Sequence, residues 1–183
     1  FQSVGYNSVL LLNIPPDKNG LIHETDARRL EELATYLRHT FDDNYLKKGN
    51  ARWMARSGDF KEFQVKKNAL VNTLLIQEDI AKGQRIERFL LEGCVEGNWQ
   101  KLAEGTTVGY KRLVRFAACQ PDSIRLTVLS ARDEARVLRM GLYYARQLME
   151  QDTNVALGNV PSGQCSIVGG NEESAKAIDG DRN

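Results

Sequence analysis

Four carboxylates near the start of the chain are of the residue type needed for general acid–base chemistry. They are Glu24, Asp26, Glu31 and Glu32. Two carboxyl groups that face one reacting bond can act as acid and base or nucleophile. Here, however, the carboxylates alternate with apolar residues that recur every three or four positions, which places them on the polar side of an expected helix. The pattern favours a solvated helix whose first turn is acidic and suits the positive end of the helix dipole.

His23 follows the turn-forming Gly20 and stands shortly before this helix. A histidine at such a position can contact a substrate or can simply be a polar residue of the turn. We favour the turn.

A second group of polar residues is concentrated just before the middle of the chain. It comprises Gln77, Glu78, Asp79, Lys82, Gln84 and Arg85. Their side chains could form a cradle of hydrogen bonds for a carbohydrate, but Asp79 and Gly83 are also the residues of a tight turn. Because spacing alone does not define a sugar pocket, we favour a structural role for the group.

Three aromatic residues, Trp53, Trp99 and Tyr110, could stack on the C–H face of a sugar ring. The same residues could instead anchor a β-sandwich or its contact with another domain, which is the interpretation that we favour.

The three cysteines, Cys94, Cys119 and Cys165, are odd in number and contain no CxxC pair. This argues against a zinc site and against a disulfide framework. We expect buried thiols, and a pairing of Cys94 with Cys119 stays open.

The composition is that of a globular protein, with 42% hydrophobic residues among 183. The 25 basic and 24 acidic residues leave a net charge of +1, so no electrostatic nucleic-acid surface is expected. No apolar run approaches the roughly 18 residues of a membrane span. The first residues, 1–4, include neither an initiator Met nor the regions of a signal peptide, so we expect the chain to be a fragment.

Residues 9–14 are a continuous apolar run, which predicts a strand buried on both faces of a parallel sheet. Pro15 and Pro16 end it. From about Asp26 to Phe41 the apolar spacing predicts a helix, with Thr25 as its N-cap. One strand and one helix cannot bury each other fully, so the unit of residues 1–41 implies neighbours upstream.

The periodicity changes after residues 42–59, a polar stretch that we interpret as a linker. Short strands separated by turn signals then predict an antiparallel β-sandwich over residues 60–145. The expected strands are 60–65, 70–77, 85–92, 99–103, 111–116, 123–129 and 137–143. A second linker, 146–164, and a further segment, 165–183, complete the expected domain organisation.

Three segments together resemble glycoside hydrolase family 29, a family of α-L-fucosidases. The first is residues 7–16, Asn-Ser-Val-Leu-Leu-Leu-Asn-Ile-Pro-Pro; the others are residues 75–87 with the sequence LIQEDIAKGQRIE and residues 105–112 with the sequence GTTVGYKR. The resemblance covers about residues 5–145. It implies a mainly β fold, in which an antiparallel, galactose-binding-like β-sandwich follows the last strand and helix of a truncated (β/α)8 barrel.

The resemblance also implies where catalysis occurs. A retaining glycosidase needs two carboxyl groups roughly 5 Å apart, and in this family they are an Asp nucleophile and a Glu acid/base on earlier barrel strands. Neither is in this chain, so we assign no catalytic residue. We expect a supporting fragment that is inactive alone and that packs on its own catalytic barrel. The complete protein would be a bacterial exo-fucosidase, in the periplasm or outside the cell, that acts on a carbohydrate substrate without a cofactor.

The tail, residues 176–183, resembles the start of a discoidin-like (F5/8 type C) carbohydrate-binding module. By that resemblance the Asp179 side chain and the Lys176 carbonyl would be the first ligands of a calcium ion, since calcium prefers oxygen ligands. An ordinary Asp-Gly turn is the alternative.

Two other functions stay open at this point. The sandwich could itself bind sugar, making the chain a lectin-like adaptor, or the chain could be the tail of a different barrel glycosidase.

Overall fold

The structure, a computed structural model, describes residues 1, 3–47 and 52–146. These residues form one compact unit that is mainly antiparallel β. The elements are α1 (Glu24–Phe41), β1 (Trp53–Ala55), β2 (Phe60–Gln64), β3 (Val71–Glu78), the short 3-10 helix η1 (Ile80–Lys82), β4 (Ile86–Val95), β5 (Asn98–Gly105), β6 (Arg112–Cys119), β7 (Ser123–Ala131) and β8 (Ala135–Tyr143).

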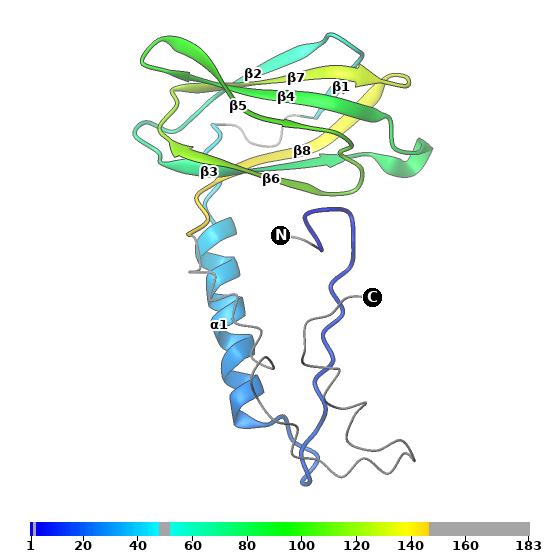
Figure 1. Ribbon diagram of the computed structural model, residues 1–183, viewed down its shortest axis with the longest axis vertical. Helices are drawn as coiled ribbons and strands as arrows, with labels where there is room; N and C mark the ends of the chain where they lie inside the picture. Colours follow the sequence, from blue (N-terminus) through cyan, green and yellow to red (C-terminus); the bar gives the residue numbers. More distant parts are fainter. Residues whose placement is uncertain (2, 48–51, 147–183) are drawn as a thin grey trace, which may run out of the picture. The chain divides into compact units, whose positions relative to one another are not determined.

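The strands form two four-stranded sheets that lie as two layers (Figure 1). One sheet has the order β1-β8-β3-β6 and the other the order β2-β7-β4-β5. Every strand pair within them is antiparallel. The sequence expectation of an antiparallel β-sandwich agrees with this arrangement.

The core lies between the two sheets because apolar residues alternate along the strands. In β7, Ile124, Leu126 and Val128 are fully buried, whereas Arg125 and Thr127 between them face outward. Successive strand residues point to opposite faces, so this alternation sends one set inward. Each fully buried aliphatic side chain stabilises the fold by about 1.5–3 kcal/mol relative to exposure.

The strand predictions agree with the structure to within a few residues at each end. The deviations occur mainly where a strand continues into a turn: β4 and β5 extend into the hairpin that joins them, and β6 extends to Cys119 before the chain crosses to the other sheet. The turn signals mark the residues of the tightest bend, such as Gly97 with a φ of 79°, but they do not show how far strand pairing continues toward it.

Helix α1 forms as predicted, but its N-cap differs. The cap is His23, whose Nδ1 accepts a hydrogen bond from the Thr25 N–H at 3.2 Å, so the prediction of Thr25 was wrong. An imidazole nitrogen can accept at this position as a hydroxyl would. The helix therefore begins at Glu24.

The apolar segment 9–14 is not a strand in this structure, contrary to expectation. Val9 and Leu11 are each 90% exposed, and Leu33 and Leu37 of α1 are also exposed. A strand requires hydrogen-bonded neighbours, and within the described residues none pairs with this segment. The apolar surface of the segment and helix is thus left open here.

The range predicted as a linker, 42–59, also contains parts of the sandwich. Leu46 is buried in the core and bridges to Val65. The Asn44 carboxamide oxygen accepts hydrogen bonds from Leu46 N–H and from Leu142 N–H, both at 3.0 Å. Strand β1 pairs with β8 in the same range. Isolated short segments like these carry too little periodicity to be recognised in sequence.

Among the described residues, no helix combines the length and the apolar character required to cross a membrane.

Candidate functional site

The polar motif around residue 78 is built on a buried carboxylate. Glu78, at the end of β3, is 1% exposed. Its Oε1 accepts hydrogen bonds from the backbone N–H groups of Arg85 (2.7 Å) and Ile86 (3.2 Å), and its Oε2 accepts one from Gly109 N–H (3.2 Å). A buried carboxylate needs such partners to offset its desolvation. Glu78 therefore joins two loops from inside the fold, and both of its carboxylate oxygens are occupied by backbone N–H groups.

Asp79 and Gly83 build the turn that follows. Asp79 Oδ1 accepts from the Ala81 N–H at 3.1 Å and so caps η1, while Gly83 ends η1 with a φ of 85°. The other carboxylate oxygen of Asp79 lies 3.3 Å from a guanidinium nitrogen of Arg136. Asp79 and Gly83 therefore build a turn, and the ion pair with Arg136 connects this turn to β8. This is the structural role that we favoured from the sequence.

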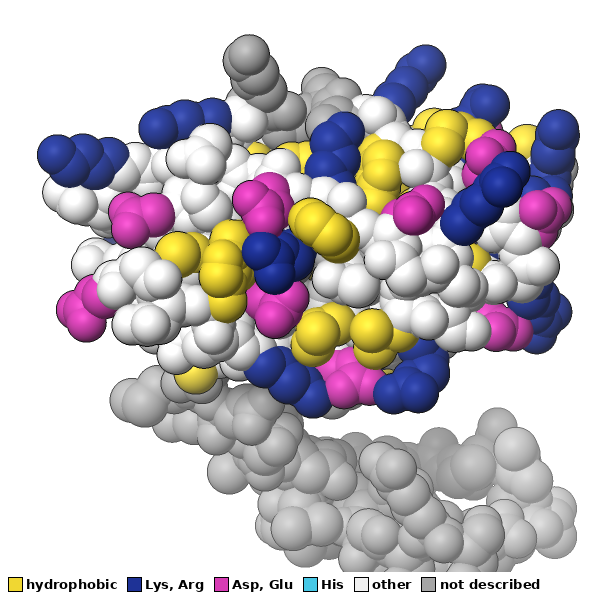
Figure 2. All heavy atoms as spheres, turned by 90° about the horizontal axis from the view of Figure 1, so that it is seen from above, with side chains coloured by type: hydrophobic (Ala, Val, Ile, Leu, Met, Phe, Trp, Pro, Cys, Tyr) yellow, Lys and Arg dark blue, Asp and Glu magenta, His cyan; other side chains and the backbone are white. Residues whose placement is uncertain are grey.

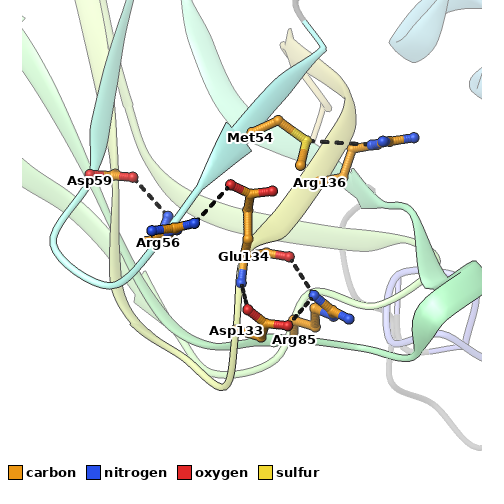
Figure 3. Close-up of polar contacts among 7 residues, drawn as sticks. All are labelled: Met54, Arg56, Asp59, Arg85, Asp133, Glu134 and Arg136. Carbon is orange, nitrogen blue, oxygen red and sulfur yellow. Dashed lines mark hydrogen bonds and ion pairs between the residues drawn. The ribbon is translucent and has the colours of Figure 1, made fainter.

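Arg85 extends the network to the turn between β7 and β8 (Figure 3). Its Nη1 lies 2.7 Å from Asp133 Oδ2 and also donates to the Glu134 carbonyl at 2.9 Å. On the other side of that turn, Arg56 lies 3.5 Å from the Glu134 carboxylate. The arginines and carboxylates are paired with each other, so these ion pairs and hydrogen bonds connect the loops at this end of the sandwich.

Four carboxylates have a lowered pKa, which is the wrong direction for a general acid. Hydrogen bonds from Lys101 and Arg88 lower the pKa of Glu104 to about 2. Arg132 and Ser130 lower the pKa of Glu87, and the Glu134 N–H with the Arg85 charge lowers that of Asp133. The Leu21 and Asn19 N–H groups lower that of Asp17. A glycosidase acid needs a raised pKa, so these four groups are not candidates for that role.

The early carboxylates of α1 do not converge on a site. Glu24, Glu31 and Glu32 are exposed on the helix surface, and Glu32 forms an ion pair with Arg29 one turn away at 2.8 Å. The geometry agrees with the solvated helix favoured from the sequence. His23 is occupied as the helix cap.

The three aromatic candidates occupy different places. Trp53 packs partly buried against the core, while Tyr110 is 59% exposed beside Lys111. Trp99 lies on β5, with the Arg125 guanidinium carbon 4.1 Å from its ring centre. The structure does not bring them together into one sugar platform.

Cys94 and Cys119 are free and partly exposed, which excludes the pairing left open above. Burial raises the pKa of the Cys119 thiol. No group of three or more His, Cys, Asp or Glu side chains suited to a metal ion occurs in the described part of the chain. Asp179 and Lys176, Cys165, the predicted linker beyond Arg146 and the segment 165–183 lie outside the described residues.

No pattern in the sequence predicted the contact between the first residues and the edge strand β6. Tyr6 bridges to Arg112, whose guanidinium carbon lies 3.9 Å from the Tyr6 ring centre. The Asn7 side-chain oxygen accepts from Lys111 N–H at 2.8 Å, and Arg115 lies 3.7 Å from the ring centre of Phe1. These contacts cover part of an exposed sheet edge, a device that limits edge-to-edge pairing.

The fold and this geometry define a β-sandwich domain preceded by a helix, without a catalytic constellation among the described residues. No protein-family model matches the chain. The chain is 33% identical over 174 residues to alpha-L-fucosidase 1 of Arabidopsis thaliana, covering 78% of this chain and 34% of the relative.

Two of the similar solved structures illustrate the likeness in fold and sequence. One is from Bacteroides ovatus and assigned as an α-L-fucosidase, with 45% identity, a TM-score of 0.80, and coverage of 88% of this chain and 28% of that chain. The other is a glycoside hydrolase 29 family member from an unknown rumen bacterium, with 33% identity, a TM-score of 0.69, and coverage of 81% and 28%.

The homologues and structural neighbours are thus α-L-fucosidases and members of glycoside hydrolase family 29, which supports that family for this chain. The chain spans about a third of the length of the curated relatives it matches.

Proposed function

We propose that these residues are the C-terminal part of a retaining exo-α-L-fucosidase of glycoside hydrolase family 29. The observation that carries the proposal is the 45% identity and TM-score of 0.80 over 88% of the chain, combined with coverage of only 28% of the Bacteroides ovatus protein. The remaining length of such relatives has room for a catalytic barrel. The complete enzyme would release terminal α-linked L-fucose from glycans.

The catalytic carboxylates belong, in this proposal, to the part of the enzyme that these residues do not match. A retaining enzyme needs an ionised nucleophile and a protonated acid held about 5 Å apart. The four carboxylates with resolved shifts have lowered pKa values, and Glu78 is occupied by three backbone N–H groups. In this proposal the chain supports catalysis and does not carry it.

The exposed apolar surface near the start of the chain is where we propose that the chain contacts the barrel. Val9 and Leu11 are almost fully exposed, and Leu33 and Leu37 of α1 are exposed as well. In the proposal, residues 1–41 supply the last strand and helix of the barrel, and the other barrel strands and helices cover these side chains. Covering a large aliphatic side chain is favourable by about 1.5–3 kcal/mol, which would fasten the sandwich to its barrel.

Two further parts of the proposal concern regions outside this unit. Residues 165–183 begin a discoidin-like carbohydrate-binding module in which Asp179 contributes to a calcium site, and the complete enzyme acts in the periplasm or outside the cell. Both derive from the sequence resemblance.

The direct test is hydrolysis of an aryl α-L-fucoside. The 183-residue chain alone should give no hydrolysis above the buffer rate, and measurable turnover by it would overturn the proposal. Mixing it with a barrel fragment of the Bacteroides ovatus relative that lacks its own last strand, last helix and sandwich should restore hydrolysis.

A matched pair of variants makes the mixing experiment specific. Leu11→Asp places a charge in the apolar segment that we propose to join the barrel, so restoration should fall at least about tenfold, the equivalent of 1.4 kcal/mol. Glu31→Gln, on the polar surface of α1, should restore as the unmodified chain does. Equal restoration by both variants would count against the barrel contact.

A further inference from the structure

The outer surface of the sheet β2-β7-β4-β5 carries a cluster that the proposed function does not use. It consists of Phe60, Glu62, Glu92, Trp99 and Arg125, and we call it the Arg125 cluster. Glu62 and Glu92 are the cross-strand partners of Arg125 on either side. Phe60 lies two residues before Glu62, and Trp99 is opposite Cys94, two residues after Glu92. Side chains two apart share a sheet surface, so all five project from the same side.

The guanidinium of Arg125 is held in place by the other four residues. Its carbon lies 4.1 Å from the ring centre of Trp99 and 5.0 Å from that of Phe60. Nε and Nη2 donate to Glu62 Oε1 at 3.0 Å and 2.6 Å, and Nη1 lies 3.8 Å from Glu92 Oε2. Stacking and the two hydrogen bonds to one oxygen of Glu62 both restrict the planar guanidinium. The cluster is therefore preorganised, with little side-chain entropy left to lose on binding.

The charges around the cluster are balanced locally. Arg88 and Lys101 both contact Glu104, at 2.6 Å and 2.7 Å, on the neighbouring strands β4 and β5. Together with the Arg125 cluster this makes three cations and three carboxylates on one sheet. Figure 2 looks onto this side of the molecule and shows basic, acidic and hydrophobic side chains interspersed over it, without a large area of one charge. Such a surface has no net charge to attract a sulfated or phosphorylated ligand.

Hydrogen-bonding capacity and aromatic surface remain available in the cluster. Within the described residues, no hydrogen bond occupies Nη1 of Arg125, Oε2 of Glu62 or either oxygen of Glu92. Phe60 is 58% exposed and Trp99 36%. The surface therefore offers charge-assisted donors and acceptors next to apolar rings, which matches a molecule with hydroxyl groups and an apolar C–H side.

We propose that the Arg125 cluster is a binding site for a neutral pyranoside. The C–H side of the sugar lies against the exposed part of Trp99 that the Arg125 guanidinium does not cover. Its hydroxyl groups donate to the carboxylates of Glu62 and Glu92 and accept from Nη1 of Arg125. Protein–protein interfaces are enriched in Trp, Phe and Arg but depleted of Glu, so it is the two carboxylates beside Arg125 that favour a sugar over a protein partner. The proposal does not rest on the fucosidase assignment, because every residue in it lies on the sandwich.

Trp99 is itself the probe for this site. The chain has two tryptophans, so the Trp53→Phe variant leaves Trp99 as the sole indole emitter. Titrating this 183-residue variant with methyl α-L-fucoside and with methyl β-D-galactoside should give a saturable change in emission for at least one of them. For a single exposed sugar we expect a Kd of about 1 mM, which corresponds to about −4.1 kcal/mol.

Three substitutions in the otherwise unmodified chain, each followed by calorimetry, test the location. Trp99→Ala should weaken binding at least tenfold, whereas Tyr110→Ala, which removes a more exposed aromatic ring elsewhere on the domain, should leave it unchanged. Arg125→Lys, which keeps the charge but loses the planar fork, should also weaken binding. Thermal unfolding of each variant establishes that the domain is folded.

Four outcomes would overturn the proposal. The first is the absence of saturation with both glycosides at about one hundred times the expected Kd. The second is binding that survives Trp99→Ala in a folded chain, and the third is binding confined to a sulfated sugar. The last is self-association that depends on Trp99 in a chain that binds neither glycoside. The last would indicate that the surface contacts protein.

Discussion

The carboxylate of Glu78 accepts a hydrogen bond from the backbone N–H of Gly109, 31 residues further along the chain, at 3.2 Å. In return, the Glu78 N–H donates to the Gly109 carbonyl at 2.9 Å. This reciprocal contact joins the end of β3 to the loop before β6. It connects the two sequence segments that most strongly resemble glycoside hydrolase family 29.

Replacing Glu78 with Ala should be strongly destabilising. Three backbone N–H groups, those of Arg85, Ile86 and Gly109, would lose their acceptor in a buried place, and each buried unpaired donor costs about 1–3 kcal/mol. We expect the free energy of unfolding to fall by about 3 kcal/mol or more in urea titrations. Glu78→Gln, which retains one acceptor, should lose less.

The control for this prediction is Glu32→Ala. Glu32 forms an exposed ion pair with Arg29 on α1, and such pairs contribute about 0.3–0.5 kcal/mol. A loss at Glu78 no larger than the loss at Glu32 would mean that the buried hydrogen bonds are not needed for the fold.

Asn7 should respond differently to Ala and to Gly. Its φ is 66°, a conformation that Gly adopts freely and Ala does not. Both substitutions remove the hydrogen bond to Lys111 N–H, but only Asn7→Ala adds backbone strain. We therefore expect Asn7→Ala to lower the stability of the attachment to β6 by about 1 kcal/mol more than Asn7→Gly.

Hydrogen exchange at the Leu113 N–H measures this difference, because that group donates to the Gly5 carbonyl at 3.0 Å. Exchange should be fastest in Asn7→Ala and intermediate in Asn7→Gly. Identical exchange rates in the two variants would show that the Asn7 backbone conformation does not contribute.

Adding a methyl group at Gly141 should disturb the junction between β8 and α1. A Cβ at this position would overlap the ring and hydroxyl of Tyr143, which is 1% exposed and packs edge-on against Phe41 at 5.1 Å. Overpacking of this kind costs about 1–3 kcal/mol. Thermal unfolding of Gly141→Ala should show the loss.

Tyr143→Ala provides the matching second substitution, since it removes the ring and the hydroxyl that the new methyl group would meet. The double variant Gly141→Ala/Tyr143→Ala should lose less stability than the sum of the two single variants, a coupling that a double-mutant cycle measures. Strict additivity would contradict the proposed overlap. Gly97→Ala, where nothing lies within 4 Å but φ is 79°, controls for backbone strain alone.

The low pKa of Glu104 predicts a pH dependence of stability. Hydrogen bonds from Lys101 and Arg88 lower it from 4.5 to about 2 in the folded chain. A carboxylate with a depressed pKa contributes stability that is complete above the unfolded value and is lost as the pH falls through the folded value. The contribution of Glu104 should therefore decrease between about pH 5 and pH 2.

Urea midpoints of the wild type and Glu104→Gln across this range provide the measurement. The difference between them should shrink as the pH falls, and added salt should reduce it because the pair is exposed. Glu31→Gln, at an exposed position without an ion pair in the described residues, should run parallel to the wild type. A constant difference between the wild type and Glu104→Gln from pH 5 to pH 2 would contradict the assignment.

Much of the sandwich could be predicted from local patterns. Ile124, Leu126 and Val128 alternate with polar residues, and this alternation alone indicates a strand with one buried side. The 3–4 spacing of Leu30, Leu33 and Leu37 likewise indicates α1. Strand β1 and the buried Leu46 were missed because three or four residues contain too little repetition to reveal a period.

The residue types of the polar motif could be read from the sequence, but their partners could not. Glu78 looked equivalent to the neighbouring Asp79, yet one is buried against Gly109 and the other caps a turn. Likewise, only the pairing of β7 with β2 and β4 brings Glu62 and Glu92 to Arg125.

The sequence by itself therefore determined the helix, most strands and the resemblance to α-L-fucosidases, because periodicity and continuous motifs are local properties of a chain. The tertiary structure decided which polar groups are buried, which are paired and which surfaces stay open. Those outcomes depend on contacts such as Asn7 with Lys111, whose residues lie 104 positions apart, and strand register brings such distant residues together only after the sheets have formed.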